Sequence, residues 1–222
     1  LLPIFAHLVL APDRGPVRRA FSVLIKVYAI VLLPAAAGLG VLAPLLFRVL
    51  YTERYANAAA YFQVLYGLVS LDIVFYSVAS SAMISAERYG AFLLSRLPIL
   101  LTAAAATVLV PAIGPLATIA VLAGSRVVAV AWLVRSARRL IEAKVPTGFV
   151  LRQTAIAAVF AALLWAGVRS LPPSAWVLAT AIPVYAVVVL GVLKATGGIG
   201  QEDRAALEEM RLPLKRVLLW LF

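Results

Sequence analysis

Long apolar stretches dominate this sequence, and short polar connections separate them. Charged residues are absent from residues 27–47, 97–125 and 170–193. A helix of about 20 apolar residues crosses the roughly 30 Å of hydrocarbon in a bilayer. The pattern therefore predicts an all-α protein, a polytopic bundle of transmembrane helices.

The apolar stretches divide into about six predicted transmembrane helices. These helices span residues 21–47, 58–84, 91–109, 116–134, 149–168 and 175–193. The predicted connections are residues 11–20, 48–57, 85–90, 110–115, 135–148 and 169–174. Proline and glycine break helices, so residues 110–115 (VPAIGP) are predicted to form a tight turn. Because every connection is short, consecutive helices should be antiparallel neighbours.

Both ends of the chain depart from this pattern. Residues 1–10 (LLPIFAHLVL) are interpreted as the end of a helix whose start is missing, and the chain as the C-terminal part of a longer protein. Residues 1–200 are assigned to the transmembrane bundle, and residues 201–222 to a cytoplasmic or interfacial tail. Apolar positions recur at helical spacing in that tail, and Lys215 and Arg216 precede an apolar end. An interfacial amphipathic helix is predicted there, with a truncated seventh transmembrane helix as the alternative.

The composition excludes a soluble domain. Hydrophobic residues make up 64% of the chain and charged residues 13%, and the mean hydropathy is +1.05. Soluble domains contain about 45–50% apolar and about 25% charged residues. The net charge of +11 would suggest nucleic acid in a soluble protein. Here basic collars at the helix ends explain it, so no nucleic-acid partner is expected.

Lysine and arginine alternate between the predicted connections and indicate an orientation. One set of connections and helix ends holds sixteen basic residues, and the alternate set holds three. The larger set comprises Arg14, Arg18, Arg19, Lys26, Arg88, Arg96, Arg135, Arg138, Arg139, Lys144, Arg152, Lys194, Arg204, Arg211, Lys215 and Arg216. The smaller set comprises Arg48, Arg54 and Arg169. The positive-inside rule places the larger set, and the C-terminus, in the cytoplasm. The protein is therefore expected in the cytoplasmic (inner) membrane as a multi-pass protein.

Two charges fall inside predicted transmembrane helices. Asp72 and Arg126 lie at similar depth near the bilayer midplane, where ionisable residues are rare and usually functional. A structural salt bridge is one explanation, and the lining of a polar transport cavity is the other. Tyr76, on the same helix face as Asp72, is a third candidate for such a cavity.

Other polar and flexible positions carry weaker predictions. A stripe at 3.6-residue spacing is assigned to helix packing and comprises Gln63, Tyr66, Ser70, Ser77, Ser81 and Ser85. Pro34, which Gly38 and Gly40 follow closely, is a candidate hinge. Membrane helices also tolerate proline residues that take no part in any motion.

Evidence for catalysis or a cofactor is thin. The chain has no cysteine, and its single histidine, His7, has no partner residue at a recognisable spacing. Metalloprotease, nucleophile-elbow and phosphate-loop motifs are absent. We therefore expect neither an enzyme nor a bound metal or other cofactor.

Four stretches together resemble the C-terminal half of polysaccharide-export flippases of the multidrug/oligosaccharidyl-lipid/polysaccharide (MOP) exporter superfamily. They are residues 1–8 (LLPIFAHL), 32–59 (a proline-bearing apolar helix and its connection), 109–124 (LVPAIGPLATIAVLAG) and 201–213 (QEDRAALEEMRLP). Each motif is weak alone, and their order and spacing carry the resemblance.

The resemblance implies a function. Such flippases enclose a central cavity between two lobes of helices and open it alternately to either side of the membrane. They move an oligosaccharide on a polyprenyl diphosphate to the outer leaflet. This chain would then be the second lobe, the missing N-terminal lobe would be its partner, and Arg126 would be the candidate contact for the diphosphate.

Three other functions stay open at this point. A drug or cation antiporter of the same superfamily is the main alternative, and Asp72 gives it weak support. A polytopic enzyme of polysaccharide assembly would need a large outer loop, and the outer connections here are short. A membrane scaffold that transports nothing is the last.

Overall fold

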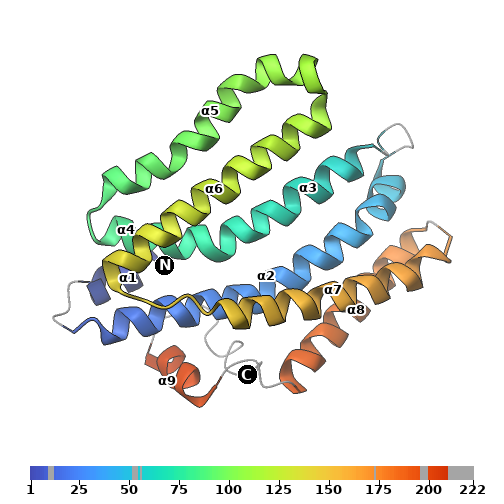
Figure 1. Cartoon of the computed structure of the whole chain (residues 1–222). Helices are drawn as coiled ribbons and strands as arrows, with labels where there is room; N and C mark the ends of the chain where they lie inside the picture. The colour runs from blue at the N-terminus through green and yellow to red at the C-terminus, as the bar shows by residue number, and fades with distance from the viewer. Residues whose placement is uncertain (10–12, 52–54, 56, 173, 196–199, 210–222) are drawn as a thin grey trace.

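The computed structural model describes residues 1–9, 13–51, 55, 57–172, 174–195 and 200–209, and helices dominate this part of the chain (Figure 1). The helices are α1 (Leu2–Val9), α2 (Gly15–Leu50), α3 (Ala58–Leu71), η2 (Asp72–Tyr76), α4 (Ser77–Ser85), α5 (Tyr89–Ile113), α6 (Pro115–Ile141), α7 (Thr147–Arg169), α8 (Ala175–Ala195) and α9 (Gln201–Glu209). The part of the chain described contains no strand, so the predicted all-α class is confirmed.

Six helical spans are long and apolar enough to cross a membrane. They are α2, the continuous run Ala58–Ser85, α5, α6, α7 and residues Ala175–Val192 of α8. Large apolar side chains on α5 and α8, among them Leu101, Val108 and Val187, are exposed, as lipid-facing positions should be. The protein is therefore a multi-pass membrane protein, as its sequence pattern predicts.

Several helices extend beyond their predicted ends. α2 begins at Gly15, inside the predicted loop 11–20, because a proline in the first helical turn loses no internal hydrogen bond. α6 continues to Ile141, so the first half of the predicted loop 135–148 is helical. Arginine is a good helix former, and positive charge is favourable near a helix C-terminus.

The turn between α5 and α6 is shorter than predicted. α5 continues through Pro111 to Ile113, and the chain reverses at Gly114, whose φ is +81°. Glycine adopts this backbone conformation without the steric cost that a Cβ would add. The predicted turn over residues 110–115 is thus correct in place but too long.

The second span is not a uniform α-helix. Its predicted range, 58–84, matches the observed Ala58–Ser85, but the five residues of η2 in its middle form a π-helix. A π-turn takes in an extra residue, so positions after it are rotated relative to a uniform 3.6-residue helix. The predicted polar stripe along this span is therefore interrupted. Ser70 and Ser81 donate to carbonyl oxygens of their own helix, both at 2.8 Å, in keeping with a packing role.

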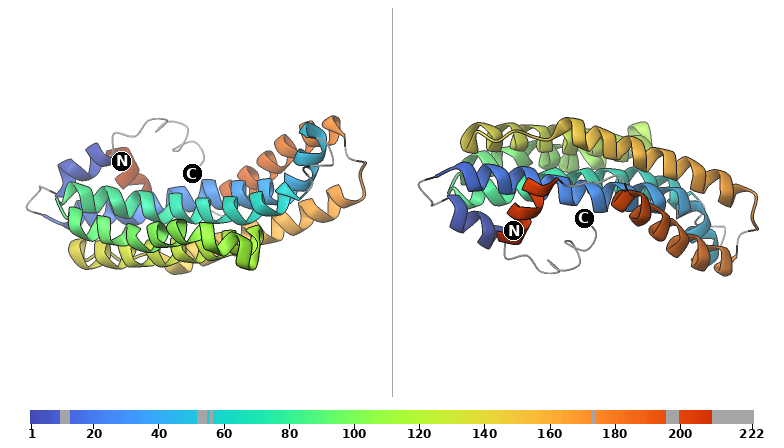
Figure 2. Two further views of the ribbon diagram at one scale, coloured as in Figure 1. Left: turned by 90° about the horizontal axis from the view of Figure 1, so that it is seen from above. Right: turned by 90° about the horizontal axis from the view of Figure 1, so that it is seen from below.

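α2 is the central helix of the bundle. It packs most extensively against α7 and α3 and less extensively against α8 and α9, while α5 and α6 form a hairpin that covers α3 and α4. Buried apolar side chains along its first half, such as Phe21, Leu24 and Ile25, form the centre of the core. Figure 2 shows that the far end of α2 turns away from the direction of α3, α5 and α6, and that α7 and α8 slope the same way.

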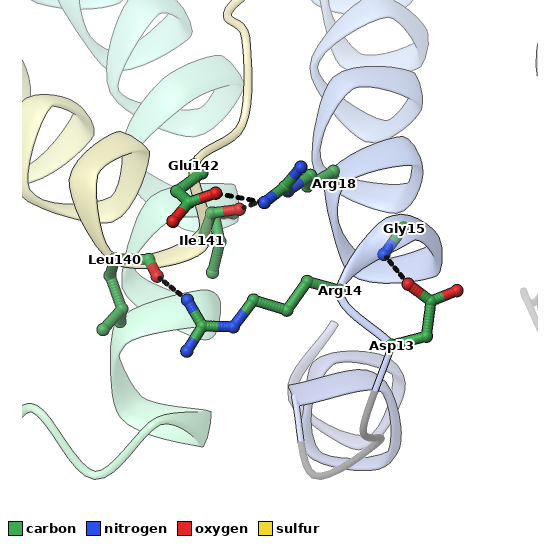
Figure 3. Close-up of polar contacts among 7 residues, drawn as sticks. All are labelled: Asp13, Arg14, Gly15, Arg18, Leu140, Ile141 and Glu142. Carbon is green, nitrogen blue, oxygen red and sulfur yellow. Dashed lines mark hydrogen bonds and ion pairs between the residues drawn. The ribbon is translucent and has the colours of Figure 1, made fainter.

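The helix ends form two groups. α2, α5 and α7 begin, and α4 and α6 end, at one end of the bundle, which we call the basic end. The α5–α6 and α7–α8 turns lie at the opposite end (Figure 1). Arg14 Nη1 donates to the Leu140 carbonyl and Arg18 Nε to the Ile141 carbonyl, both at 3.1 Å, and Arg18 forms an ion pair with Glu142 (Figure 3). These contacts satisfy carbonyls at the end of α6 and connect it to the start of α2.

The tail begins with a short helix, α9, which packs on α2. Lys26 Nζ lies 2.6 Å from Asp203 Oδ2, and the Leu207 side chain is buried. The acidic residues in the first turn of α9 suit the positive end of the helix dipole. Residues 210–222 lie outside the described residues, so the predicted interfacial helix stays a prediction beyond residue 209.

Candidate functional site

The π-helix η2 places two polar side chains in the middle of the second membrane span. Asp72 is its first residue and Tyr76 its last, and both side chains are buried. η2 contacts α2 and α6 as well as its flanking helices, so it lies inside the bundle. Single π-turns within α-helices are frequent at functional sites, which directs attention to this segment.

Asp72 pairs with the charge that the sequence places at the same depth. Arg126, near the middle of α6, makes an ion pair through Nη2 with Asp72 Oδ2. The Arg126 side chain is 33% exposed and the Asp72 side chain is 11% exposed. Pairing reduces the high cost of placing either charge in a membrane. The structure thus contains the salt bridge that the sequence offered as one explanation of these two charges. The other explanation, that they line a transport cavity, stays open.

The ion pair leaves hydrogen-bonding capacity unused. Asp72 Oδ1 and Arg126 Nε are buried and have no hydrogen-bond partner among the described residues. A buried donor or acceptor without a partner costs about 1–3 kcal/mol. A ligand with both an anionic acceptor and a donor would complete this pair.

A second arginine approaches the same segment from α5. The guanidinium carbon of Arg96 lies 3.9 Å from the centroid of the Tyr76 ring and 5.8 Å from that of Phe92. Such cation–π contacts stabilise a partly desolvated guanidinium. The Tyr76 hydroxyl is buried beside the Ser95 and Arg96 side chains, but it forms no hydrogen bond of good geometry within the described chain.

Sequence reasoning missed Arg96, which it counted with the charges at the basic end. The residue lies about two turns inside α5, since the helix begins at Tyr89. A signal was available, because Arg96 falls within the predicted helix 91–109 and not in a connection. We refer to Asp72, Tyr76, Arg96 and Arg126 as the polar cluster.

A groove lies beside the ion pair, between the second span and α6. Its volume is about 260 Å³. Asp72 and Arg126 line it with apolar atoms only, and Leu68, Phe75 and Val130 are among its other lining residues. Two arginines and one aspartate give the polar cluster a net charge of +1. An environment of this kind attracts anions, because apolar walls weaken the screening of the charges.

The candidate hinge residues lie on α2, apart from the polar cluster. A Cβ at Gly38 would lie 2.4 Å from Cε1 of Tyr185 on α8, so this glycine permits close packing of the two helices. The Tyr185 hydroxyl donates to the Pro34 carbonyl at 2.9 Å, and Gln63 Nε2 donates to the Gly40 carbonyl at 2.7 Å. Bending at this segment stays a prediction.

Comparison with protein-family models, with curated proteins and with solved structures finds no match to this chain. The resemblance to polysaccharide-export flippases therefore stays a hypothesis from the sequence. Within the described residues, no group of three histidine, cysteine, aspartate or glutamate side chains could hold a metal ion. The polar cluster is the candidate site on its own geometry and electrostatics.

Proposed function

We propose that this chain is the second lobe of a membrane transporter that moves an oligosaccharide linked to a polyprenyl diphosphate from the cytoplasmic to the outer leaflet by alternating access. The observation that carries the proposal is the net positive polar cluster, which forms where η2 of the second membrane span meets Arg96 on α5 and Arg126 on α6. The sequence resemblance to polysaccharide-export flippases supports the same substrate class. In this proposal the basic end, and with it the C-terminus, faces the cytoplasm.

The chemistry of a diphosphate suits the polar cluster. Arg126 Nε and the Tyr76 hydroxyl supply buried donors without partners among the described residues. Arg96 supplies a second positive charge beside Tyr76. Hydrogen bonds from ionised donors to phosphate oxygens are roughly twice as strong as neutral ones.

Asp72 has a distinct role in this proposal. Its carboxylate offsets the charge of Arg126, so the polar cluster attracts an anion without holding it permanently. Transport requires binding that is favourable enough for entry and weak enough for release. Alternating access then needs a rearrangement of the helices around η2, for which the Pro34–Gly40 segment of α2 is the candidate hinge.

Depletion of the protein in its host tests this function. Lipid-linked oligosaccharide should accumulate on the cytoplasmic leaflet, and surface polysaccharide should be lost. Wild-type protein should restore export, and R126Q or R96Q should not, although both variants should reach the membrane. R88Q is the matched control, because Arg88 is exposed at the start of α5, outside the polar cluster. Normal export in depleted cells would contradict the proposal.

A drug or cation antiporter is the second candidate, and one observation favours it. Asp72 Oδ1 is a buried carboxylate oxygen without a partner among the described residues, and a cation would satisfy it. The same depletion experiment separates the two functions. New sensitivity to cationic drugs with unchanged lipid-linked oligosaccharide would support the antiporter, and D72N should then reproduce the sensitivity.

A further inference from the structure

A second hollow lies at the basic end, outside the polar cluster. It occupies about 720 Å³ beside the last turns of α6 and the start of α7. Its apolar part includes Val128, Trp132 and Val145, and its basic part consists of Arg135, Arg138 and Arg139. We call this hollow the arginine groove.

Helical geometry explains why apolar and basic residues line one groove. Val128, Trp132, Arg135 and Arg139 follow one another on α6 at spacings of three or four residues, which place them on one helix face. Apolar positions therefore give way to basic ones along a single face toward the end of the helix. This arrangement could not be predicted while residues from 135 onward were assigned to a loop, because a loop would not align the arginines with Trp132.

The three arginines have no acidic counterpart within the part of the chain that the structure describes. None of the ion pairs found there includes Arg135, Arg138 or Arg139, and all three side chains are exposed. Glu142, the nearest acidic residue after them in the chain, pairs with Arg18 on α2 (Figure 3). The lining of the groove contains no acidic residue. The arginine groove therefore carries an uncompensated positive charge.

Trp132 places the arginine groove at the level of a membrane surface. Its side chain is 53% exposed, and it lies between the apolar centre of α6 and the three arginines. Tryptophan is enriched where hydrocarbon meets lipid headgroups. A soluble anion would satisfy the arginines but leave the apolar wall exposed. A molecule with an anionic head and an apolar chain would cover both parts.

We propose that the arginine groove binds an anionic phospholipid from the leaflet at the basic end. The arginines bind its phosphate, since the guanidinium fork matches phosphate oxygens in a bidentate manner. One acyl chain lies along Val128 and Trp132. Basic pockets between transmembrane helices bind anionic lipid headgroups by the same physics. Its charged residues are not those of the polar cluster, although the arginine groove and the groove beside the ion pair share Ala131 and Val134 in their linings.

Fluorescence of Trp132 tests this proposal directly. The full chain would carry Phe in place of Trp165, Trp176 and Trp220, so that Trp132 is the only tryptophan. Reconstitution into vesicles with brominated phosphatidylglycerol or brominated phosphatidylcholine then reports which lipid quenches Trp132. We expect phosphatidylglycerol to bind beside Trp132 about tenfold more strongly, given the attraction of several arginines for an anionic lipid. Equal quenching by both lipids would overturn the proposal.

A pair of matched variants separates a local site from general attraction. R135A/R138A/R139A should abolish the preference for phosphatidylglycerol over phosphatidylcholine, so that the two lipids bind about equally, because it removes the charges that bind the phosphate. R19A/R88A/K144A also removes three positive charges from the basic end, but none of these residues lines the arginine groove. It should keep the preference, and an equal loss in both variants would overturn the proposal.

Two further controls address folding and the source of the anion. R135K/R138K/R139K keeps the charge but loses the bidentate fork, so its preference for phosphatidylglycerol should fall between that of the wild type and that of R135A/R138A/R139A, and its folding should match the wild type. Millimolar inorganic phosphate should not relieve quenching by phosphatidylglycerol. Relief by phosphate would identify a site for a soluble anion and overturn the lipid assignment.

Discussion

At the scale of single residues, the ion pair between Asp72 and Arg126 combines a structural demand with unused chemistry. Each charge alone would be costly in the membrane, so the pair has a reason to exist without any substrate. Yet one atom of each partner, Asp72 Oδ1 and Arg126 Nε, is buried without a hydrogen bond among the described residues. In the proposed function, stability and substrate binding depend on different atoms of the same two side chains, and variants of these residues can separate the two roles.

Exchange of the two charges separates these roles. D72A should lower the stability by about 1–3 kcal/mol, because Arg126 is left without its counter-charge but retains some exposure. The double variant D72R/R126D should recover most of this loss, as measured by thermal unfolding in detergent. If it also restored export, the pair would be structural only. Restored folding with export still absent supports a substrate contact.

Removal of the Tyr76 hydroxyl addresses substrate contact in another way. Y76F keeps the ring that faces Arg96 and deletes a buried hydroxyl without a partner in the described chain. The melting temperature should therefore stay equal or rise slightly, whereas export should fall if the hydroxyl binds the diphosphate. Y185F is the control, since its hydroxyl donates to the Pro34 carbonyl and its loss should cost about 1 kcal/mol. Unchanged export by Y76F would remove Tyr76 from the proposed contacts.

At the scale of elements, hydropathy predicts the number and order of the spans well, because each span must cover the same hydrocarbon thickness. It predicts their ends less well. Polarity alone suggests a loop at Arg135, Arg138 and Arg139. These residues instead extend α6, where their positive charge is favourable near the negative end of the helix dipole. η2 was beyond prediction from the sequence pattern, since a π-turn changes the hydrogen bonding of a helix and not its average hydropathy.

The residues of the candidate site also differ in how far the sequence predicts them. Asp72 and Arg126 were predictable because charges stand out in apolar helices and the topology places them at equal depth. The Arg96 contact with Tyr76 was not, because it depends on how the α5–α6 hairpin packs over η2. Sequence reasoning located the charges, and tertiary packing decided their partners.

Two glycines of α2 test whether its proline segment is packed or flexible. G38A should destabilise the bundle by about 1–3 kcal/mol, since the new methyl group would overlap Tyr185 at 2.4 Å. G40A meets no atom within 4 Å and should be neutral or stabilising by up to about 1 kcal/mol through helix propensity. Thermal unfolding of both variants measures the difference. Equal destabilisation by the two substitutions would contradict the packing role of Gly38.

The G40A variant also carries information on the hinge. If Gly40 allows α2 to bend during transport, G40A should keep full stability and reduce export. Full export by a stable G40A protein would exclude Gly40 as a hinge residue and leave Pro34 as the remaining candidate. The Gln63 contact to the Gly40 carbonyl is made to the backbone, so this substitution does not remove it.

At the scale of the whole molecule, charge and connectivity agree on an orientation. The connections rich in arginine meet at the basic end, where Arg14 and Arg18 bind the end of α6 (Figure 3). The turn between α7 and α8 lies at the opposite end with Arg169 (Figure 1). The proposed direction of transport and the leaflet of the arginine groove both depend on which end faces the cytoplasm.

The absence of cysteine from the chain makes this orientation directly measurable. K144C places a single thiol in the connection between α6 and α7 at the basic end, and S170C places one at the opposite end; both positions are exposed. A maleimide that does not cross membranes should label S170C in intact cells, and K144C only after permeabilisation, because the positive-inside rule places the basic end in the cytoplasm. The unsubstituted protein is the blank.

The reverse pattern would invert the topology, and the arginine groove would then face the outer leaflet. Labelling of both thiols in intact cells would contradict an odd number of crossings between these positions, where the structure has one helix, α7.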